Sequence, residues 1–116
     1  MIVDDHAPMR AILRRLCKEV AGEFIECANG AEAVIAYAQH RPDWVLMDIN
    51  MPGQDGFSAS AEIRSRFPDA RIVVVSEDSS PVFRARAREV GAIDFVAKEN
   101  LLLLVDVFAR STPGLS

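Results

Sequence analysis

The alternation of apolar runs with helical patterns constrains the fold of this chain more than any other sequence feature. Short apolar runs are separated by segments whose apolar residues recur at helical spacing. The predicted strands are residues 1–3, 24–27, 44–47, 72–75 and 93–96. The third and fourth of them, 44–47 and 72–75, are apolar at all four residues, which is typical of strands buried on both faces of a parallel sheet.

Helical patterns fill the intervals between these runs. They are predicted near residues 9–20, 30–40, 57–67, 81–91 and 100–110. The last of them is expected to begin at Asn100 as N-cap. Five successive β–α units predict an α/β fold with a doubly wound parallel sheet and right-handed crossovers. We expect this domain to cover residues 1–110, and residues 111–116 to form a tail or the start of a linker.

Composition narrows the class of protein. The 116 residues are enough for one domain, and half of them are apolar. A net charge of −4 argues against direct nucleic acid binding. No apolar run approaches the roughly 20 residues that cross a membrane. Cys17 and Cys27 lack the spacing of a metal or redox motif, so we expect packing thiols in a reducing cytoplasm.

Polar residues follow four of the predicted strands. Asp4 and Asp5 come directly after the first, Asp48 after the third, Ser76 after the fourth and Lys98 just beyond the fifth. Taken singly, each has an ordinary explanation as a helix cap, a turn residue or a solvated charge. Because ligands of such sheets bind beyond the carboxyl ends of the strands, we expect all of these side chains to meet at one edge.

The chemistry of such a cluster is specific. Two carboxylates about 5 Å apart repel by roughly 3 kcal/mol at an effective dielectric constant of 20. Three carboxylates therefore call for a cation, and oxygen ligands with open positions suit Mg²⁺. A carboxylate beside Mg²⁺ and the ammonium of Lys98 is a nucleophile toward phosphorus. The hydroxyl of Ser76, with the two cations, would hold the phosphoryl oxygens.

These residues lie in motifs that span most of the chain. The motifs are residues 3–5 (Val-Asp-Asp), residues 47–53 with 55–57, residues 75–76, and residues 91–98. In them the chain resembles the receiver domains of response regulators in two-component signalling. Asp4-Asp5-His6 and Lys98-Glu99 are most similar to the subfamily with a helix-turn-helix output domain. The resemblance implies a flavodoxin-like sheet in the order 2-1-3-4-5.

The resemblance also implies roles for single residues. Asp48 would be the phosphoacceptor. Its phosphoryl group would come from a sensor histidine kinase or a phosphotransfer protein. Asp4, Asp5, Asp48 and the backbone carbonyl of Asn50 would bind Mg²⁺. Lys98 would pair with the phosphoryl group, and Ser76 and Phe95 would be the switch residues.

The sequence departs from that family at three points. Only residues 1–3 precede the acidic pair, where relatives carry several more residues. Glu77 follows the switch Ser76, where relatives have a small or uncharged residue, and its carboxylate would repel a phosphoryl group. No output domain follows the helix at residues 100–110, so the chain is a stand-alone receiver or one cut from a longer protein.

Three functions stay open at this level. The first is a phosphorylation-dependent signalling switch rather than a turnover enzyme. The second is a phosphohydrolase with an aspartyl nucleophile, which would usually carry a general acid two residues after Asp48, where this chain has Asn50. The third is a degenerate receiver that binds other proteins without phosphorylation.

The last helix carries an excess of apolar residues. Seven of the eight residues from 101 to 108 are apolar. On a helical wheel Leu101, Leu104, Val105 and Phe108 share the face expected to pack on the sheet. Leu103 and Val107 are expected on the opposite side. Their exposure would mark a contact surface for a second copy of the chain or for an output domain.

Overall fold

The structure is a computed structural model that describes residues 1–111. Residues 112–116, within the predicted tail, lie outside the described residues. The strands are β1 (Ile2–Val3), β2 (Glu26–Cys27), β3 (Val45–Met47), β4 (Ile72–Ser76) and β5 (Asp94–Ala97). The helices are α1 (Ala7–Cys17), α2 (Gly30–His40), α3 (Gly56–Arg66), α4 (Pro81–Glu89) and α5 (Leu103–Ser111), and a 3-10 helix covers Lys98–Asn100.

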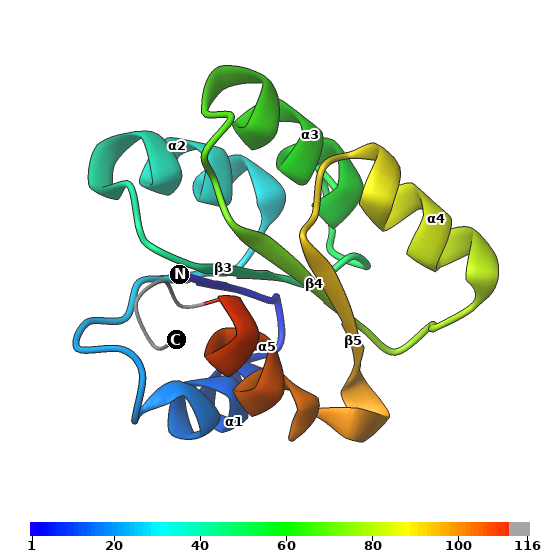
Figure 1. Cartoon of the computed structure of the whole chain (residues 1–116). Helices are drawn as coiled ribbons and strands as arrows, with labels where there is room; N and C mark the ends of the chain where they lie inside the picture. The colour runs from blue at the N-terminus through cyan, green and yellow to red at the C-terminus, as the bar shows by residue number, and fades with distance from the viewer. Residues whose placement is uncertain (112–116) are drawn as a thin grey trace.

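The strands form one parallel sheet in the order β2-β1-β3-β4-β5, as predicted. Helices α1 and α5 cover one face of this sheet, and α2, α3 and α4 cover the other (Figure 1). Because every strand runs in the same direction, all the carboxyl ends lie along one edge. The sheet thus brings the polar residues after the strands to a common side of the molecule.

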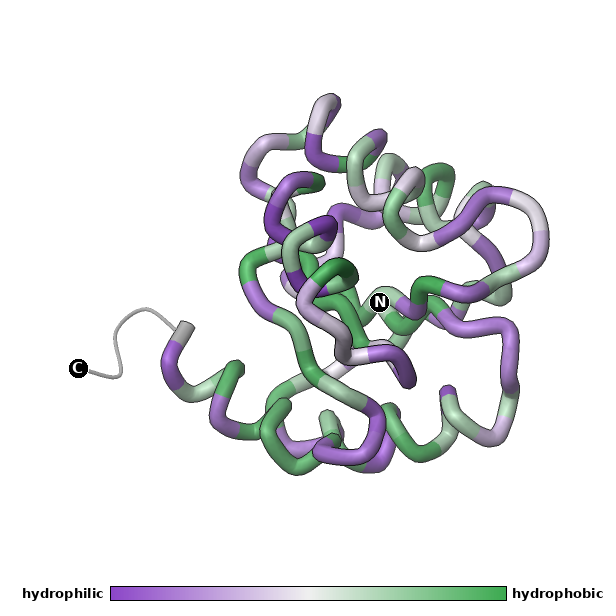
Figure 2. The backbone as a smooth tube through the Cα atoms, turned by 90° about the vertical axis from the view of Figure 1, so that its right-hand side faces the viewer, coloured by the Kyte–Doolittle hydropathy of each residue, from purple (hydrophilic) through white to green (hydrophobic). Residues whose placement is uncertain are grey.

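Burial on both faces explains why the central strands are apolar throughout. Successive side chains of β4 point to opposite faces. Val73 and Val75 pack in the cluster under α1 and α5, whereas Ile72 packs in the cluster under α2 and α3. Figure 2 shows hydrophobic colours along the strands inside the molecule and hydrophilic colours mainly toward its outside. Within the described residues, no helix is long and apolar enough to cross a membrane.

Side-chain caps set the starts of α2 and α3. Asn29 accepts a hydrogen bond from the amide of Glu32 at 2.9 Å, and Asp55 accepts one from the amide of Ser58 at 2.8 Å. Each bond satisfies an amide that has no partner inside its helix. The prediction of a helix over residues 30–40 is confirmed, and that of 57–67 is displaced by one residue.

The prediction for the last helix is wrong in two respects. Asn100 lies in the 3-10 helix instead of capping α5, which begins at Leu103. The buried face contains Leu104, Val107 and Phe108, whereas Val105 is 51% exposed. Val107 therefore cannot belong to a contact surface, while Leu103, 49% exposed, remains accessible. Because α5 packs against α1 as well as the sheet, its buried face is rotated from the predicted one. A run of seven apolar residues in eight does not reveal that rotation.

Candidate functional site

Four side chains named from the sequence lie at the carboxyl edge of the sheet. Asp4 follows β1, Asp48 follows β3, Ser76 is the last residue of β4, and Lys98 follows β5. Backbone hydrogen bonds between strands hold the two carboxylate-bearing positions. The amide of Asp4 donates to Cys27 O at 3.0 Å, and that of Asp48 donates to Val3 O at 2.9 Å.

Lys98 joins the two carboxylates. Its Nζ lies 3.0 Å from Oδ2 of Asp4 and 3.1 Å from Oδ1 of Asp48. The side chains of Asp4 and Asp48 are 1% and 7% exposed, and that of Lys98 is 11% exposed. The structure therefore brings residues 94 positions apart in the chain into one buried ionic cluster.

Asp4 is held at both of its carboxylate oxygens. Oδ1 accepts a hydrogen bond from the amide of His6 at 2.9 Å, and Oδ2 accepts one from Lys98. The guanidinium of Arg10 donates to the backbone carbonyl of Asp4 at 2.7 Å and pairs with Glu26 at 3.1 Å. His6 is the residue before α1 and contributes its backbone amide rather than its imidazole.

Burial and charge perturb two groups of the cluster. Burial raises the pKa of Asp48 above its ordinary value, the charge of Asp4 adds to this effect, and Lys98 opposes it. Burial by itself lowers the pKa of Lys98, but the hydrogen bond that Lys98 donates to Asp4 and the charges of both carboxylates outweigh it and raise that pKa. Lys98 is therefore held as a cation between two carboxylates that repel each other.

The donor set fits a hard divalent cation. One oxygen from each of Asp4, Asp5 and Asp48 lies within 4.8 Å of the others. Asp5 is exposed, so the cluster opens to solvent on that side. Carboxylate oxygens with room for water are the ligands that Mg²⁺ prefers. Asn50, whose carbonyl is a further candidate ligand, is exposed two residues after Asp48.

Gly56 is a site residue to which the sequence analysis assigned no role. It is the first residue of α3, and its amide donates to Ile49 O at 3.1 Å. A Cβ atom added to Gly56 would lie 1.9 Å from the backbone oxygen of Asp48. Only glycine lets α3 begin so close to the backbone of Asp48. In the sequence, the only sign of this role was that Gly56 directly follows Asp55, a typical helix N-cap residue.

The remaining predicted residues differ in how far they are buried. Ser76 is buried, and its Oγ accepts a hydrogen bond from the amide of Asp78 at 3.1 Å. Phe95 is half-buried on β5, and the guanidinium of Arg84 lies 4.7 Å from its ring centroid. Glu77, which follows Ser76, is exposed. The contacts made by Asp78 and Arg84 had no counterpart in the sequence analysis.

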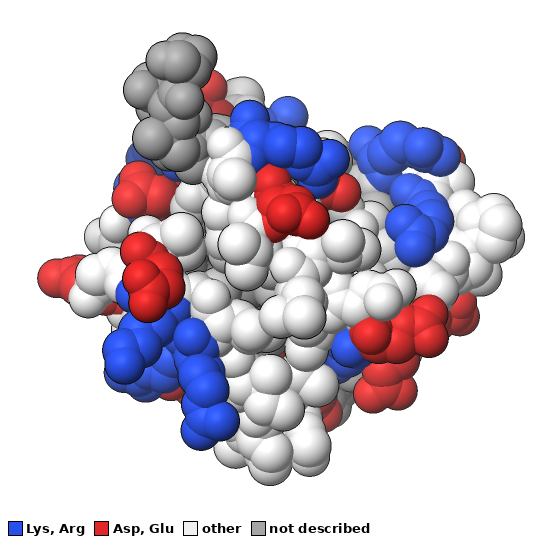
Figure 3. All heavy atoms as spheres, turned by 60° about the horizontal axis from the view of Figure 1, so that its bottom comes forward, with Lys and Arg blue, Asp and Glu red and all other residues white. Residues whose placement is uncertain are grey.

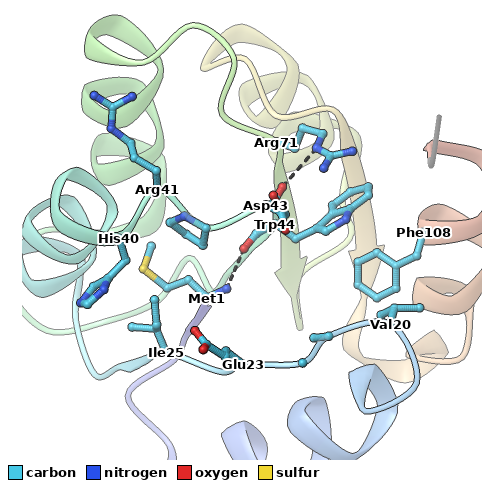
Figure 4. Close-up of a pocket in the computed structure, with 13 residues that line it drawn as sticks. Met1, Val20, Glu23, Ile25, His40, Arg41, Asp43, Trp44, Arg71 and Phe108 are labelled. Carbon is cyan, nitrogen blue, oxygen red and sulfur yellow. Dashed lines mark hydrogen bonds between the residues drawn. The ribbon is translucent and has the colours of Figure 1, made fainter.

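A hollow lies at the opposite, amino-terminal edge of the sheet. It has a volume of about 810 Å³, and its lining includes Met1, Ile25, Trp44 and Phe108. Figure 4 shows the amino group of Met1 donating a hydrogen bond to the Trp44 carbonyl there, a contact of 2.6 Å. None of the carboxylates described above lines this hollow. The site at the carboxyl edge is therefore separate from it.

A parallel sheet in this order, with carboxylates and a lysine gathered at its carboxyl edge, places the chain in the class of doubly wound α/β domains, whose ligands bind beyond the carboxyl ends of the strands. The model of the response regulator receiver domain family matches residues 1–106. The chemotaxis protein CheY of Bacillus subtilis is 39% identical over 99 residues, which cover 84% of this chain and 82% of CheY.

Two solved structures show the same fold. A LuxR-family two-component response regulator from Aurantimonas sp. SI85-9A1 has a TM-score of 0.88 at 34% identity, covering 95% of this chain and 81% of that chain. A chain of the CheX–CheY–BeF3–Mg²⁺ complex of Borrelia burgdorferi has a TM-score of 0.87 at 28% identity, covering 96% of this chain and 87% of that chain. This protein belongs to the response regulator receiver domain family of two-component signal transduction.

Proposed function

We propose that this receiver is a switch that accepts a phosphoryl group on Asp48. The observation that carries the proposal is the contact of Lys98 with both buried carboxylates at the carboxyl edge of the sheet. A lysine held as a cation beside a carboxylate can neutralise an incoming phosphoryl group without moving far. The opening on the side of Asp5 provides the approach.

Mg²⁺ is the proposed cofactor. Asp4, Asp5, Asp48 and the carbonyl of Asn50 would hold it, and when bound it would supply positive charge to the phosphoryl oxygens. The proposal is supported by the three carboxylate oxygens within 4.8 Å of one another. It is also supported by a relative from Borrelia whose structure is a complex with BeF3 and Mg²⁺.

The proposed donor is the phosphohistidine of a sensor histidine kinase or a phosphotransfer protein. A carboxylate oxygen of Asp48 attacks phosphorus, the P–N bond to the donor histidine breaks, and the imidazole leaves. Lys98 then pairs with a phosphoryl oxygen, and the Ser76 hydroxyl donates to another. Hydrolysis of the acyl phosphate returns the free carboxylate, so the protein is a slowly reset switch rather than a turnover enzyme.

Incubation with Mg²⁺ and phosphoramidate, followed by measurement of the intact mass, tests this function. The wild-type chain should gain one phosphoryl group, and Asp48→Asn should gain none because an amide oxygen is a poor nucleophile. Asp69→Asn, which removes an exposed carboxylate away from the site, is the matched control and should behave as wild type. No gain in the wild type would reject the switch and favour a phosphorylation-independent binding module.

Helix α5 is the proposed contact with a second copy of the chain or an output domain. Leu103 and Val105 on α5 are 49% and 51% exposed, Leu102 just before it is 74% exposed, and these residues replace Val107 in this role. Figure 3 views the side of α1 and α5 and shows an area without charged groups, bordered by basic and acidic side chains. Exposed apolar side chains such as those of Leu102, Leu103 and Val105 favour protein contact over solvent.

Sedimentation of wild type and Leu103→Glu, with and without phosphodonor, tests self-association through α5. We expect a concentration-dependent dimer of the wild type that Leu103→Glu weakens. A wild type that stays monomeric at every concentration in both states would reject self-association through α5.

A further inference from the structure

The side chain of Arg84 on α4 contacts both the segment that follows the switch residue Ser76 and the switch residue Phe95. Its Nε donates a hydrogen bond of 3.1 Å to the carbonyl of Ser79, in the segment between β4 and α4. Its guanidinium carbon lies 4.7 Å from the centroid of the Phe95 ring on β5. One exposed side chain thus contacts both the segment that follows Ser76 and the aromatic residue of the neighbouring strand.

A series of hydrogen bonds leads from the Ser76 hydroxyl to the first turn of α4. The amide of Asp78 donates to Ser76 Oγ at 3.1 Å, and the amide of Ser80 donates to Oδ1 of Asp78 at 2.9 Å. Ser80 caps α4 by accepting from the amide of Phe83 at 3.4 Å. The Ser79 carbonyl that holds Arg84 lies within this same segment.

Phe95 also packs close to the segment that follows Asp48. It packs against the buried cluster that contains Ile49, Phe57 and Val74. Ile49 is the residue directly after Asp48. A change in the position of the Phe95 ring therefore alters packing beside the proposed phosphorylation site.

We propose that Arg84 is a positioning residue that holds Phe95 in its unphosphorylated arrangement. This inference rests on the proposed function. When the Ser76 hydroxyl turns to a phosphoryl oxygen on Asp48, the amide of Asp78 loses its acceptor and the segment from Ser76 to α4 shifts. The shift withdraws the Ser79 carbonyl from Arg84 and releases the ring.

Contacts made only in the unphosphorylated state stabilise that state and oppose the other. A cation over an aromatic ring at an exposed site changes such an equilibrium about two- to fivefold. Loss of Arg84 should therefore raise the rate of phosphorylation by phosphoramidate by about that factor.

The test compares Arg84→Met with Arg88→Met. Methionine keeps an unbranched apolar stem and the helix propensity of arginine but lacks the guanidinium. Arg88 is exposed one turn further along α4, so its substitution removes the same charge from the same helix. The readout is the ¹⁹F resonance of Phe95 in protein labelled with 4-fluorophenylalanine, assigned among the six phenylalanines by its loss in Phe95→Leu.

Without phosphodonor, the Phe95 resonance of Arg84→Met should move toward its position in wild-type protein saturated with beryllofluoride and Mg²⁺. The amides of Ser80 and Phe83 should exchange with solvent faster. Arg88→Met should match wild type in both measurements. A Phe95 resonance unchanged in Arg84→Met would overturn the proposal. If Arg84→Met fails to fold, as judged by circular dichroism, Arg84→Gln takes its place with the same criteria.

The two proposals fail in different ways. If the wild type takes up no phosphoryl group at Asp48, but Arg84→Met still changes the Phe95 resonance relative to Arg88→Met, the proposed function is wrong, and Arg84 positions the ring without any coupling to phosphorylation. If the wild type is phosphorylated and Arg84→Met matches Arg88→Met in resonance and rate, the positioning role is wrong and the proposed function stands.

Discussion

Substitution of Lys98 by methionine is the sharpest perturbation of the ionic cluster. Methionine keeps the apolar stem and removes the charge that lies 3.0 Å from Asp4 and 3.1 Å from Asp48. The two carboxylates then face each other in a buried site without a counter-charge. We expect Lys98→Met to unfold at a lower urea concentration than wild type at pH 7 without Mg²⁺.

The magnitude follows from the separation of the charges. The carboxylate oxygens lie within 4.8 Å of each other. At an effective dielectric constant of 20, two unit charges at that distance repel by about 3.5 kcal/mol. Removal of one partner from a buried ion pair costs about 3–5 kcal/mol. We therefore expect the free energy of unfolding to fall by roughly 3 kcal/mol.

Urea denaturation with and without Mg²⁺ measures this effect. Saturating Mg²⁺ should stabilise Lys98→Met more than wild type, because the ion replaces the missing charge. Adding Asp4→Asn to Lys98→Met should recover stability by removing one of the repelling carboxylates. Lys18→Met is the control, because Lys18, the other lysine of the chain, is exposed. A Lys98→Met protein within about 0.5 kcal/mol of wild type would refute the reasoning.

Three further predictions concern other positions. Gly56→Ala should cost about 1–3 kcal/mol of stability and slow phosphorylation, because its Cβ would lie 1.9 Å from Asp48 O. Gly22→Ala, with nothing within 4 Å of its Cβ, should be neutral or slightly stabilising in the same urea titration. Glu77→Ala should raise the phosphorylated fraction by about twofold at fixed donor, since like charge near the site is screened but not abolished; an unchanged fraction would mean that its carboxylate is too far away. Burial raises the pKa of the Cys17 thiol to about 11. Its alkylation by iodoacetamide should therefore stay slow through pH 9 and accelerate toward pH 11. Because the folded state holds the thiol proton more tightly than the unfolded state does, the free energy of unfolding should decrease over the same rise in pH. Fast alkylation of the native protein at pH 8 would contradict it.

The course of the chain was largely predictable from the sequence because apolar periodicity is a local property. Apolar runs such as 72–75, between helical patterns, favour interior strands, and the first polar residue after each run then lies where its strand ends. The positions of Asp48 and Lys98 at one edge followed from that reasoning. Each strand boundary differs from its prediction by no more than two residues.

Side-chain contacts between elements were decided only by the tertiary structure. Neither the rotation of α5, which buries Val107 and exposes Val105, nor the contact of Arg84 with Phe95 has a local signal, because each depends on how two elements pack. The role of Gly56 was hidden from the sequence in the same way. The glycine is visible there, but how closely it approaches the backbone of Asp48 depends on the angle at which α3 leaves the sheet. Periodicity specifies which residues an element can bury, whereas the neighbouring elements select which of them it does bury.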